Sequence, residues 1–199
     1  MPETQLPLLP GEEFSDWEHS LCFTGHRPDK LPTGDELKAL IQALNMHITR
    51  IVNSSGFDRF YTGLADGIDY YAAQQIFRLR DAGHPVHIIG VQPCEDYREV
   101  YRFFRHDMRH FDEMLRQCDK IIVLPGRRFD KGVFLQRNKY MVEHSSAVLA
   151  VCDAAGRSGS AQTLAYAKQL GLAYCHLPVR APGPPYPAPQ DWPAECRGL

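Results

Sequence analysis

The sequence lacks several features that would place it at once in a large protein class. No apolar run approaches the roughly 18 residues that a membrane-spanning helix needs, and the six cysteines form no C-x-x-C pair. A zinc ribbon and a redox dithiol are therefore excluded as starting hypotheses, and no metal site is predicted. Cys22, Cys152 and Cys175 fall in apolar runs, as small core residues do.

The sequence also lacks a large excess of positive or negative charge, and it lacks several familiar motifs. With a formal net charge of -2, the chain has no overall positive field to attract nucleic acid or an anionic membrane, so we expect neither as a partner. The dinucleotide fingerprint G-x-G-x-x-G, the lysine of a phosphate-binding P-loop and the G-x-S-x-G turn of hydrolases are all absent. Any site must be inferred from the fold pattern and the chemistry of the turns.

What the chain does have is the composition of one ordinary globular domain. Its 199 residues are 44% hydrophobic and 23% charged, which suits a single domain with a substantial core. We predict a flexible acidic lead-in over residues 1–19, one domain over 20–178, and a proline-rich tail over 179–199 that lies extended along the domain. The lead-in is unlike a signal peptide, and we expect a cytoplasmic protein.

Short apolar segments alternate with longer stretches of helical period, which is typical of βαβ units. The predicted strands are 21–24, 59–62, 86–91, 120–124, 147–152 and 173–177. The predicted helices are one that follows a capping box at Thr33 and Glu36, and then 67–82, 97–117, 134–144 and 161–170. Together they indicate a single Rossmann-like, doubly wound α/β domain, with a mostly parallel sheet of about six strands and helices on both faces.

The predicted helix 97–117 carries two rows of side chains. The apolar stripe, assigned to the core, consists of Tyr97, Tyr101, Phe104, Met108, Phe111 and Leu115. The basic ridge, one position further on, consists of Arg98, Arg102, Arg105 and Arg109. Nearby acidic residues favour a flank of salt bridges. The alternatives are contact with an anionic partner and arginines that reach the ligand's phosphates. His106 and His110 are interpreted as part of a solvated face rather than as metal ligands.

Three turns that follow predicted strands are rich in glycine and small polar residues, and a parallel sheet would bring them to one edge. The first contains Thr24, Gly25, His26 and Arg27. Here Gly25 lets the backbone approach a ligand and Arg27 offers a planar fork for phosphate or carboxylate. The alternative is a tight turn with a solvated arginine.

The second turn leads directly into a helix and contains Gly63, Ala65, Asp66, Gly67 and Asp69. Free N–H groups at the helix start favour an anion. Asp66 and Asp69 are three residues apart and are expected on nearly the same side, where they suit ribose hydroxyls, a base amino group or acid/base chemistry at a sugar carbon. The alternative is helix capping.

The third turn contains Asp153, Ser158, Gly159 and Ser160 and opens a helix that includes Thr163. Hydroxyls and a glycine at a helix start predict a second phosphate cradle, with an ordinary serine cap as the alternative. Arg137 and Asn138 begin another predicted helix and are assigned to the same cleft, Arg137 on a phosphate and Asn138 on a base or ribose.

The chain resembles the YpsA-like family of the SLOG superfamily. The resemblance rests on T-G-H-R-P-D-K-L-P at 24–32, G-L-A-D-G-I-D at 63–69, R-N-K-Y-M-V at 137–142 and S-G-S-A-Q-T at 158–163. It implies a Rossmann-like fold and a nucleotide-derived ligand of the AMP, ADP-ribose or NAD type. The family's last loop usually reads G-G-T-x-x-T, so this chain keeps the hydroxyl at Ser160 and loses one glycine.

Three functional hypotheses follow. The first is a nucleotide-binding sensor or regulatory protein without a fixed cofactor. The second, by resemblance to the related lonely-guy phosphoribohydrolases, is an enzyme acting at an N-glycosidic bond, with Asp66 or Asp69 as the catalytic carboxylate. The third is a nucleic-acid adaptor that uses the basic ridge, as implied by the related DNA-processing protein A family. The pattern leaves oligomerisation open.

Overall fold

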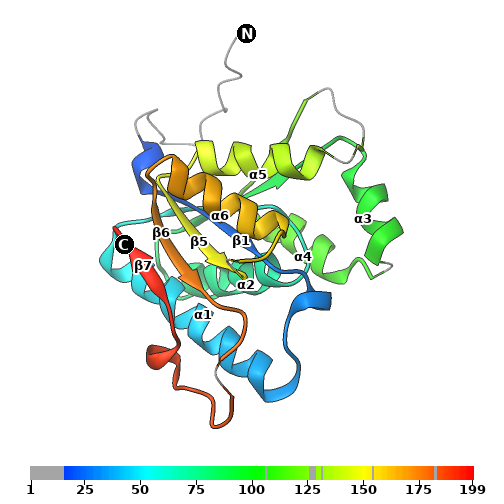
Figure 1. The fold of residues 1–199 in the computed structure, drawn as a ribbon. Coiled ribbons are helices and arrows are strands. Elements are labelled where there is room, and N and C mark those ends of the chain that lie inside the picture. The colour runs from blue at the N-terminus through cyan, green and yellow to red at the C-terminus, as the bar shows by residue number, and fades with distance from the viewer. Residues whose placement is uncertain (1–15, 106, 126–128, 131, 154, 182) are drawn as a thin grey trace.

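The computed structural model describes residues 16–105, 107–125, 129–130, 132–153, 155–181 and 183–199. Of the predicted lead-in, positions 1–15 lie outside these residues. The described chain forms an α/β fold around one seven-stranded sheet with the strand order β4-β3-β2-β1-β5-β6-β7 (Figure 1). Neighbours from β4 to β6 are parallel, and β7 pairs antiparallel with β6.

The elements follow the predicted alternation closely. The strands are β1 (Ser20–Gly25), β2 (Arg59–Thr62), β3 (His87–Gln92), β4 (Lys120–Val123), β5 (Ala147–Val151), β6 (Ala173–Leu177) and β7 (Glu195–Arg197). The helices are α1 (Gly34–Ser54), α2 (Ile68–Asp81), α3 (Tyr97–Arg105), α4 (Arg109–Gln117), α5 (Val133–Glu143) and α6 (Gly159–Gln169), with short 3-10 turns η1 (Asp16–His19), η2 (Pro28–Lys30) and η3 (Pro189–Asp191).

Both faces of the sheet are covered, which explains why the strands read as nearly continuous apolar runs. Phe23 of β1 belongs to a core that also contains Leu44 of α1 and Ile76 of α2. Its neighbour Cys22 faces the opposite way, into a second core shared with Leu164 of α6. All six predicted strands are confirmed, and with them the mostly parallel Rossmann-like sheet.

The prediction of one helix over 97–117 is wrong, because α3 ends at Arg105 and α4 begins at Arg109. The carboxylate of Asp107 accepts a hydrogen bond from the Arg109 backbone N–H at 3.0 Å, a local bond that competes with a continuous helix. The apolar stripe is broken as a result. Phe104, assigned to the core, is 55% exposed, whereas the rings of Tyr101 and Phe111 meet at 4.7 Å.

Two smaller expectations also change. Thr33 stands at the N-cap of α1, but its side chain makes no capping hydrogen bond. The partner that a capping box requires is engaged elsewhere, because the Glu36 carboxylate lies 3.7 Å from Arg180. Cys175, interpreted as a plain buried thiol, forms a disulfide with Cys196 of β7.

The part of the chain predicted as an extended tail contributes to the fold. It supplies β7 at the edge of the sheet and the side chain of Trp192, which is buried in the same core as Phe23. No helix in the described part of the chain is long and apolar enough to span a bilayer.

Candidate functional site

The candidate site is a pocket of about 330 Å³ at the carboxyl ends of the central strands. The strand order reverses between β1 and β5, because the chain runs outward to β4 on one side of β1 and resumes with β5 on the other. Open α/β sheets place their ligands at such a switch point. The predicted site residues that line the pocket are Thr24, Gly25, His26, Arg27, Ala65, Asp69, Arg137, Asn138, Ser158, Gly159 and Ser160.

Two glycines allow the first two turns to pack closely against each other, because neither has a side chain. A Cβ on Gly25 would lie 2.3 Å from Cβ of Ile68, and a Cβ on Gly67 would lie 2.5 Å from the carbonyl oxygen of His26. The Ile68 N–H donates to that carbonyl at 3.2 Å. Gly25 is therefore required for the packing between the turns. It also lines the pocket, so the approach of its backbone to a ligand stays a prediction.

The two carboxylates of the second turn do not share a side, which corrects the prediction. Asp69 is buried on the pocket wall and accepts from the Gly63 N–H at 3.0 Å. Asp66 accepts from the Gly67 N–H at 2.9 Å and pairs with Nδ1 of His110 at 2.8 Å. His110 also stacks on Tyr70 at 3.8 Å, so it is not part of a freely solvated face.

Burial controls the charge of Asp69. Removal from water raises the pKa of its carboxyl, while the nearby guanidinium groups of Arg137 and Arg27 act in the opposite direction. The backbone N–H of Gly63 also favours the ionised form. The pocket thus contains a buried carboxylate that two arginines help to keep charged.

Arg137 and Asn138 connect three elements rather than projecting freely into the cleft. Nη1 of Arg137 donates to the Gly63 carbonyl at 2.6 Å, and its Nε and Nη2 donate to Oδ1 of Asn138 at 3.1 and 2.9 Å. Nδ2 of Asn138 donates to Thr163 at 3.0 Å. A Cβ on Gly63 would lie 2.5 Å from the Arg137 guanidinium carbon, so Gly63 and Thr163 support this network from outside the pocket lining.

The start of α6 supplies backbone donors to the pocket. Ser158 caps the helix by accepting from the Ala161 N–H at 3.1 Å, and the Ser160 hydroxyl donates to the Gly25 carbonyl at 2.7 Å. Both hydroxyls are therefore used within the protein. The backbone N–H groups of Gly159 and Ser160 belong to the first helical turn, where no intrahelical acceptor exists, and both residues line the pocket.

His26 is held by the loop after β5. Its Nε2 accepts from the Asp153 N–H at 3.3 Å and lies 3.6 Å from the Asp153 carboxylate. Burial lowers the pKa of His26, against the opposing pull of Asp153. An Nε2 that accepts a hydrogen bond belongs to the neutral ring with its proton on Nδ1. Asp153 thus acts behind His26 and does not line the pocket.

Arg27 lines the pocket with its guanidinium against an aromatic ring. Its guanidinium carbon lies 5.4 Å from the ring centre of Phe134, which Arg137 also approaches, at 5.7 Å. Among the described residues Arg27 makes no ion pair. Aromatic contact with a guanidinium orients the group while leaving its in-plane donors available.

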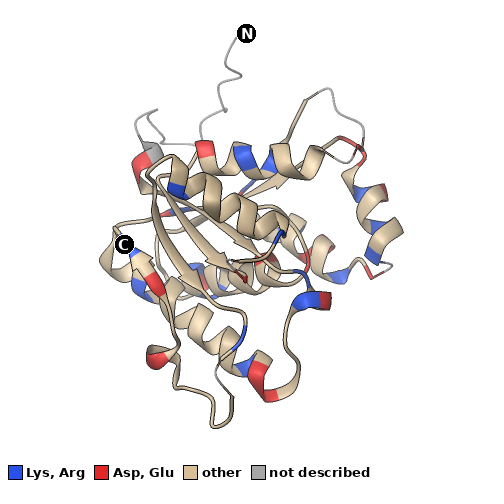
Figure 2. Ribbon diagram, viewed as in Figure 1, with Lys and Arg blue, Asp and Glu red and all other residues tan. Residues whose placement is uncertain are grey.

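Sequence reasoning did not assign several pocket residues to the site: Phe23, Asp29, Lys30, Arg105, Phe134 and Met141. Asp29 and Lys30 follow Arg27 in the quoted T-G-H-R-P-D-K-L-P motif, so the motif itself carried the signal. Arg105 was assigned to the basic ridge, for which contact with an anionic partner or with the ligand's phosphates was the alternative to salt bridges. Figure 2 shows basic residues both on η2, which follows β1, and along α3 (Figure 2).

The basic ridge is largely neutralised. Arg98 pairs with Asp112 at 2.6 Å, Arg109 with Asp107 at 2.7 Å and Arg105 with Asp29 at 3.5 Å. The break between α3 and α4 also interrupts the row. These contacts agree with the interpretation as a flank of salt bridges, with Arg105 turned toward the pocket as well.

The fold is that of a Rossmann-like α/β protein, and its switch-point pocket is lined by Arg27, Lys30, Arg105 and Arg137 among other residues. The family model described as the YspA SLOG family, YpsA, matches residues 21–172. The chain therefore belongs to this family.

Three similar proteins were found. An uncharacterized SPbeta prophage-derived protein of Bacillus subtilis (strain 168), YoqJ, is 28% identical over 157 residues, which cover 74% of this chain and 86% of that protein. The X-ray structure of DNA processing protein A from Streptococcus pneumoniae aligns with a TM-score of 0.51 at 21% identity, over 78% of this chain and 48% of that one. This chain thus spans about half of the Streptococcus protein.

DNA processing protein A from Helicobacter pylori aligns with a TM-score of 0.56 at 17% identity, over 86% of this chain and 69% of that one. Its structure was described for a single-stranded DNA binding mode. At these identities the two solved structures show a shared fold, which matches the sheet and helices described above.

Proposed function

We propose that the switch-point pocket binds a nucleotide-derived small molecule of the AMP, ADP-ribose or NAD type, and that the protein acts as a sensor or regulatory protein. The observation that carries the proposal is one pocket that combines the guanidinium of Arg27, which has no ion pair within the described part of the chain, the first-turn amides of α6 and the buried carboxylate of Asp69. These groups match the two chemical ends of a nucleotide.

The phosphate end belongs with Arg27 and α6. A planar guanidinium binds phosphate oxygens with two parallel hydrogen bonds, and helix N-termini favour anions through free N–H groups and the helix dipole. Lys30 and Arg105 add positive charge at the pocket lining. The hydroxyls of Ser158 and Ser160 position the loop and do not serve as the main phosphate donors.

The nucleoside end belongs with Asp69. A carboxylate held by backbone N–H groups suits ribose hydroxyls or a base amino group, because each of these donates a hydrogen bond. Phe23 and Met141 provide apolar lining beside it. The single-stranded DNA described for the Helicobacter protein is also built of phosphate, sugar and base, which supports a ligand of this chemistry.

A thermal-shift screen of the purified chain tests the proposal, with AMP, ATP, NAD, ADP-ribose and cyclic nucleotides as probes. A ligand present at about a hundred times its dissociation constant stabilises the fold by roughly 2.7 kcal/mol, and we expect such a shift for at least one of them. If none of these nucleotides raises the melting temperature, the proposed ligand class is wrong.

A second candidate is hydrolysis or transfer at the N-glycosidic bond of the bound nucleotide, favoured by the burial of Asp69 and the raised pKa of its carboxyl. Asp66 is held by His110 outside the pocket lining, so Asp69 would have to act as the catalytic carboxylate alone. Released base is assayed in the same wells. Base release that is abolished in Asp69→Asn, with binding retained, selects the enzyme, whereas binding without release selects the sensor.

A further inference from the structure

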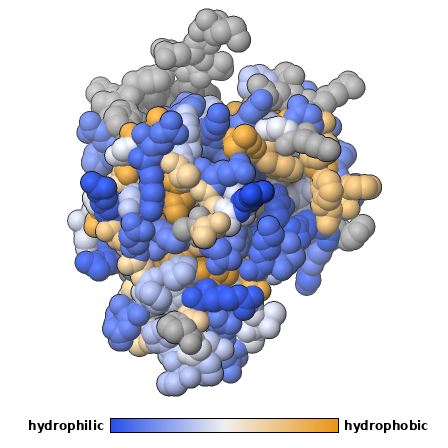
Figure 3. All heavy atoms as spheres, in the orientation of Figure 1, coloured by the Kyte–Doolittle hydropathy of each residue, from blue (hydrophilic) through white to orange (hydrophobic). Residues whose placement is uncertain are grey.

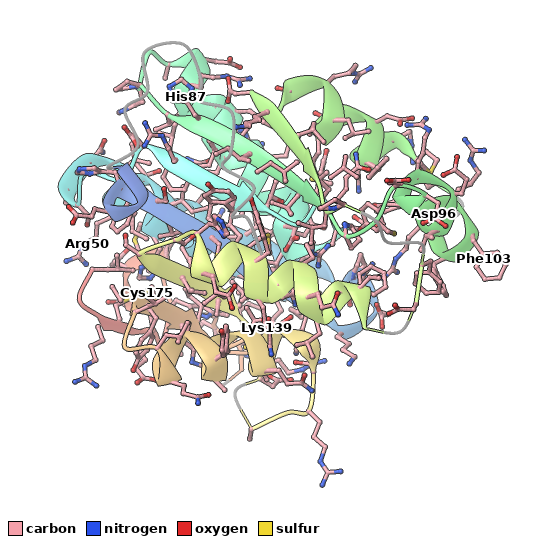
Figure 4. All side chains as sticks on the ribbon, turned by 90° about the horizontal axis from the view of Figure 1, so that it is seen from above. Arg50, His87, Asp96, Phe103, Lys139 and Cys175 are labelled. Carbon is pink, nitrogen blue, oxygen red and sulfur yellow. A yellow bond between two sulfur atoms is a disulfide. The ribbon has the colours of Figure 1, made fainter. Side chains whose placement is uncertain are left out.

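Three phenylalanines form an exposed aromatic surface beside the pocket. Phe103 and Phe104 of α3 are 76% and 55% exposed, and Phe129, before α5, is 39% exposed. The three rings form a row in space. The ring centres of Phe103 and Phe104 are 5.2 Å apart, and those of Phe104 and Phe129 are 5.9 Å apart. Figure 3 shows apolar side chains at the surface over α3, and in Figure 4 Phe103 points away from the body of the protein (Figures 3 and 4).

The aromatic surface leads directly into the pocket. The ring centres of Phe129 and Phe134 are 5.9 Å apart. The guanidinium carbon of Arg27 lies 5.4 Å from the ring centre of Phe134. Phe134 itself lines the pocket. A continuous row of rings therefore runs from solvent to the group that is assigned to phosphate.

Packing does not account for these side chains. A buried phenylalanine contributes to stability by leaving water, whereas Phe103 keeps most of its surface in water and gives up that gain. Contiguous exposed apolar groups mark interaction sites. Because this patch adjoins a cationic pocket, the charge of the surroundings indicates which partner it fits.

The surroundings favour an anionic partner. Arg102 directly precedes Phe103 in α3, is exposed, and has no ion pair with any described residue. Arg105 is paired with Asp29 only at 3.5 Å and reaches the pocket lining. The acidic groups near the phenylalanines include Asp29, Asp130 and the exposed Glu99, which lies one turn before Phe103 on α3. The Asp130 carboxylate accepts from the Gly132 N–H.

We infer that the ligand extends out of the pocket as a single-stranded oligonucleotide, with one nucleotide in the pocket and the bases beyond it stacked on Phe103, Phe104 and Phe129. Proteins bind single strands with this combination of basic side chains along the backbone and aromatic rings against the bases. The inference rests on the proposed function, because it names the class of nucleotide ligand that the same pocket receives.

The test measures fluorescence anisotropy of a labelled oligothymidylate of about ten nucleotides, alongside displacement by thymidine monophosphate and by an abasic phosphodiester strand of equal length. The variant is Phe103→Ala combined with Phe104→Ala, which removes only exposed rings. Leu170→Ala, at 47% exposure on the far end of α6, is the matched control.

We expect the wild-type chain to bind the oligothymidylate at least about tenfold more tightly than the mononucleotide, the scale of stacking one base on an aromatic ring. The double variant should lose that advantage while its affinities for the mononucleotide and the abasic strand stay within about twofold, and Leu170→Ala should behave as wild type. Equal loss for the abasic strand would show that the rings do not stack bases and would overturn the inference.

The other outcomes separate the two proposals. A mononucleotide that binds as tightly as the oligothymidylate leaves the proposed function standing and overturns the inference. An oligothymidylate that binds through the phenylalanines while no mononucleotide binds shows stacking without a nucleotide in the pocket, and it overturns both the proposed function and the inference. A wild-type dimer that the double variant dissociates, with oligonucleotide binding unchanged, assigns the aromatic surface to a second copy of the chain instead.

Discussion

At the scale of single residues, Gly67 sets the distance between the two turns that build the pocket. Its φ of +92° lies in the region that favours glycine, and its missing side chain leaves room for the His26 carbonyl. Gly83 has nearly the same φ, +94°, but nothing lies within 4 Å of a Cβ there. The two positions therefore separate backbone strain from close packing.

We predict that Gly83→Ala lowers the free energy of unfolding by about 1 kcal/mol and Gly67→Ala by about 3 kcal/mol or more. The first adds only the strain of a side chain at positive φ, whereas the second must also displace the first turn. Urea denaturation of both variants measures the difference. Equal losses would mean that the turns are not held together at Gly67.

The stability of the folded protein should depend on pH through His26. Burial holds the pKa of His26 below its ordinary value, so on acidification the unfolded chain takes up this proton before the folded chain does. The stability contributed by the neutral ring is present above about pH 6.5 and is lost as the pH falls through the lower, folded pKa.

The predicted result is a free energy of unfolding that declines between about pH 7 and pH 5, with a smaller decline in His26→Gln, whose side-chain oxygen can still accept from the Asp153 N–H. His47, whose pKa burial also lowers, preserves part of the wild-type dependence. Unfolding curves at several pH values provide the comparison. An identical pH dependence in the variant would exclude His26 as a contributor.

At the scale of elements, the C-terminal segment is attached to the domain through a buried tryptophan. Trp192 is 3% exposed, and its indole N–H donates to the Pro178 carbonyl at 3.1 Å. The segment also reaches β6 through β7 and the Cys175–Cys196 disulfide. It is therefore part of the folded core.

Trp192→Ala is expected to destabilise the protein by about 3 to 5 kcal/mol, the usual cost of removing a buried tryptophan. Leu170→Ala, an exposed control, should stay within about 0.5 kcal/mol of wild type. Denaturant midpoints of the two variants decide the matter. A Trp192→Ala protein as stable as the control would show that the buried indole does not contribute to the stability of the core.

The order of elements could be predicted because it depends on local periodicity. Six strands and most helices follow from apolar runs and helical spacing, and the turns at their ends supply most of the pocket lining. The division of 97–117 could not be predicted, because it depends on a bond between Asp107 and the Arg109 backbone. β7 is three residues long and exposed, so only pairing with β6 defines it.

Long-range contacts explain what sequence reasoning missed at the site. Arg105 reaches the pocket beside Asp29, 76 positions away in the chain. Asp66 looked equivalent to Asp69 because both begin the same helix, yet a histidine from α4, 44 positions away, withdraws it. Residue spacing predicts the face of a helix on which a side chain lies. It does not predict which residue from another element contacts that side chain.

At the scale of the whole molecule, the net charge of -2 conceals a local concentration of positive charge. Arg27, Lys30, Arg105 and Arg137 all line the switch-point pocket, together with the acidic Asp29 and Asp69. The opposite end of the molecule, where Figure 4 shows Arg50, offers a cation outside the pocket lining (Figure 4). A change of one positive charge can therefore be made in the pocket or far from it.

The most direct test is calorimetric titration of the nucleotide that gives the largest thermal shift into the wild-type chain, Arg27→Ala and Arg50→Ala. Because Arg27 is assigned to the phosphate, its removal should weaken binding by about tenfold or more, while Arg50→Ala should bind as wild type does. Equal affinity in the Arg27→Ala and wild-type proteins would contradict the assignment of this pocket to a nucleotide phosphate.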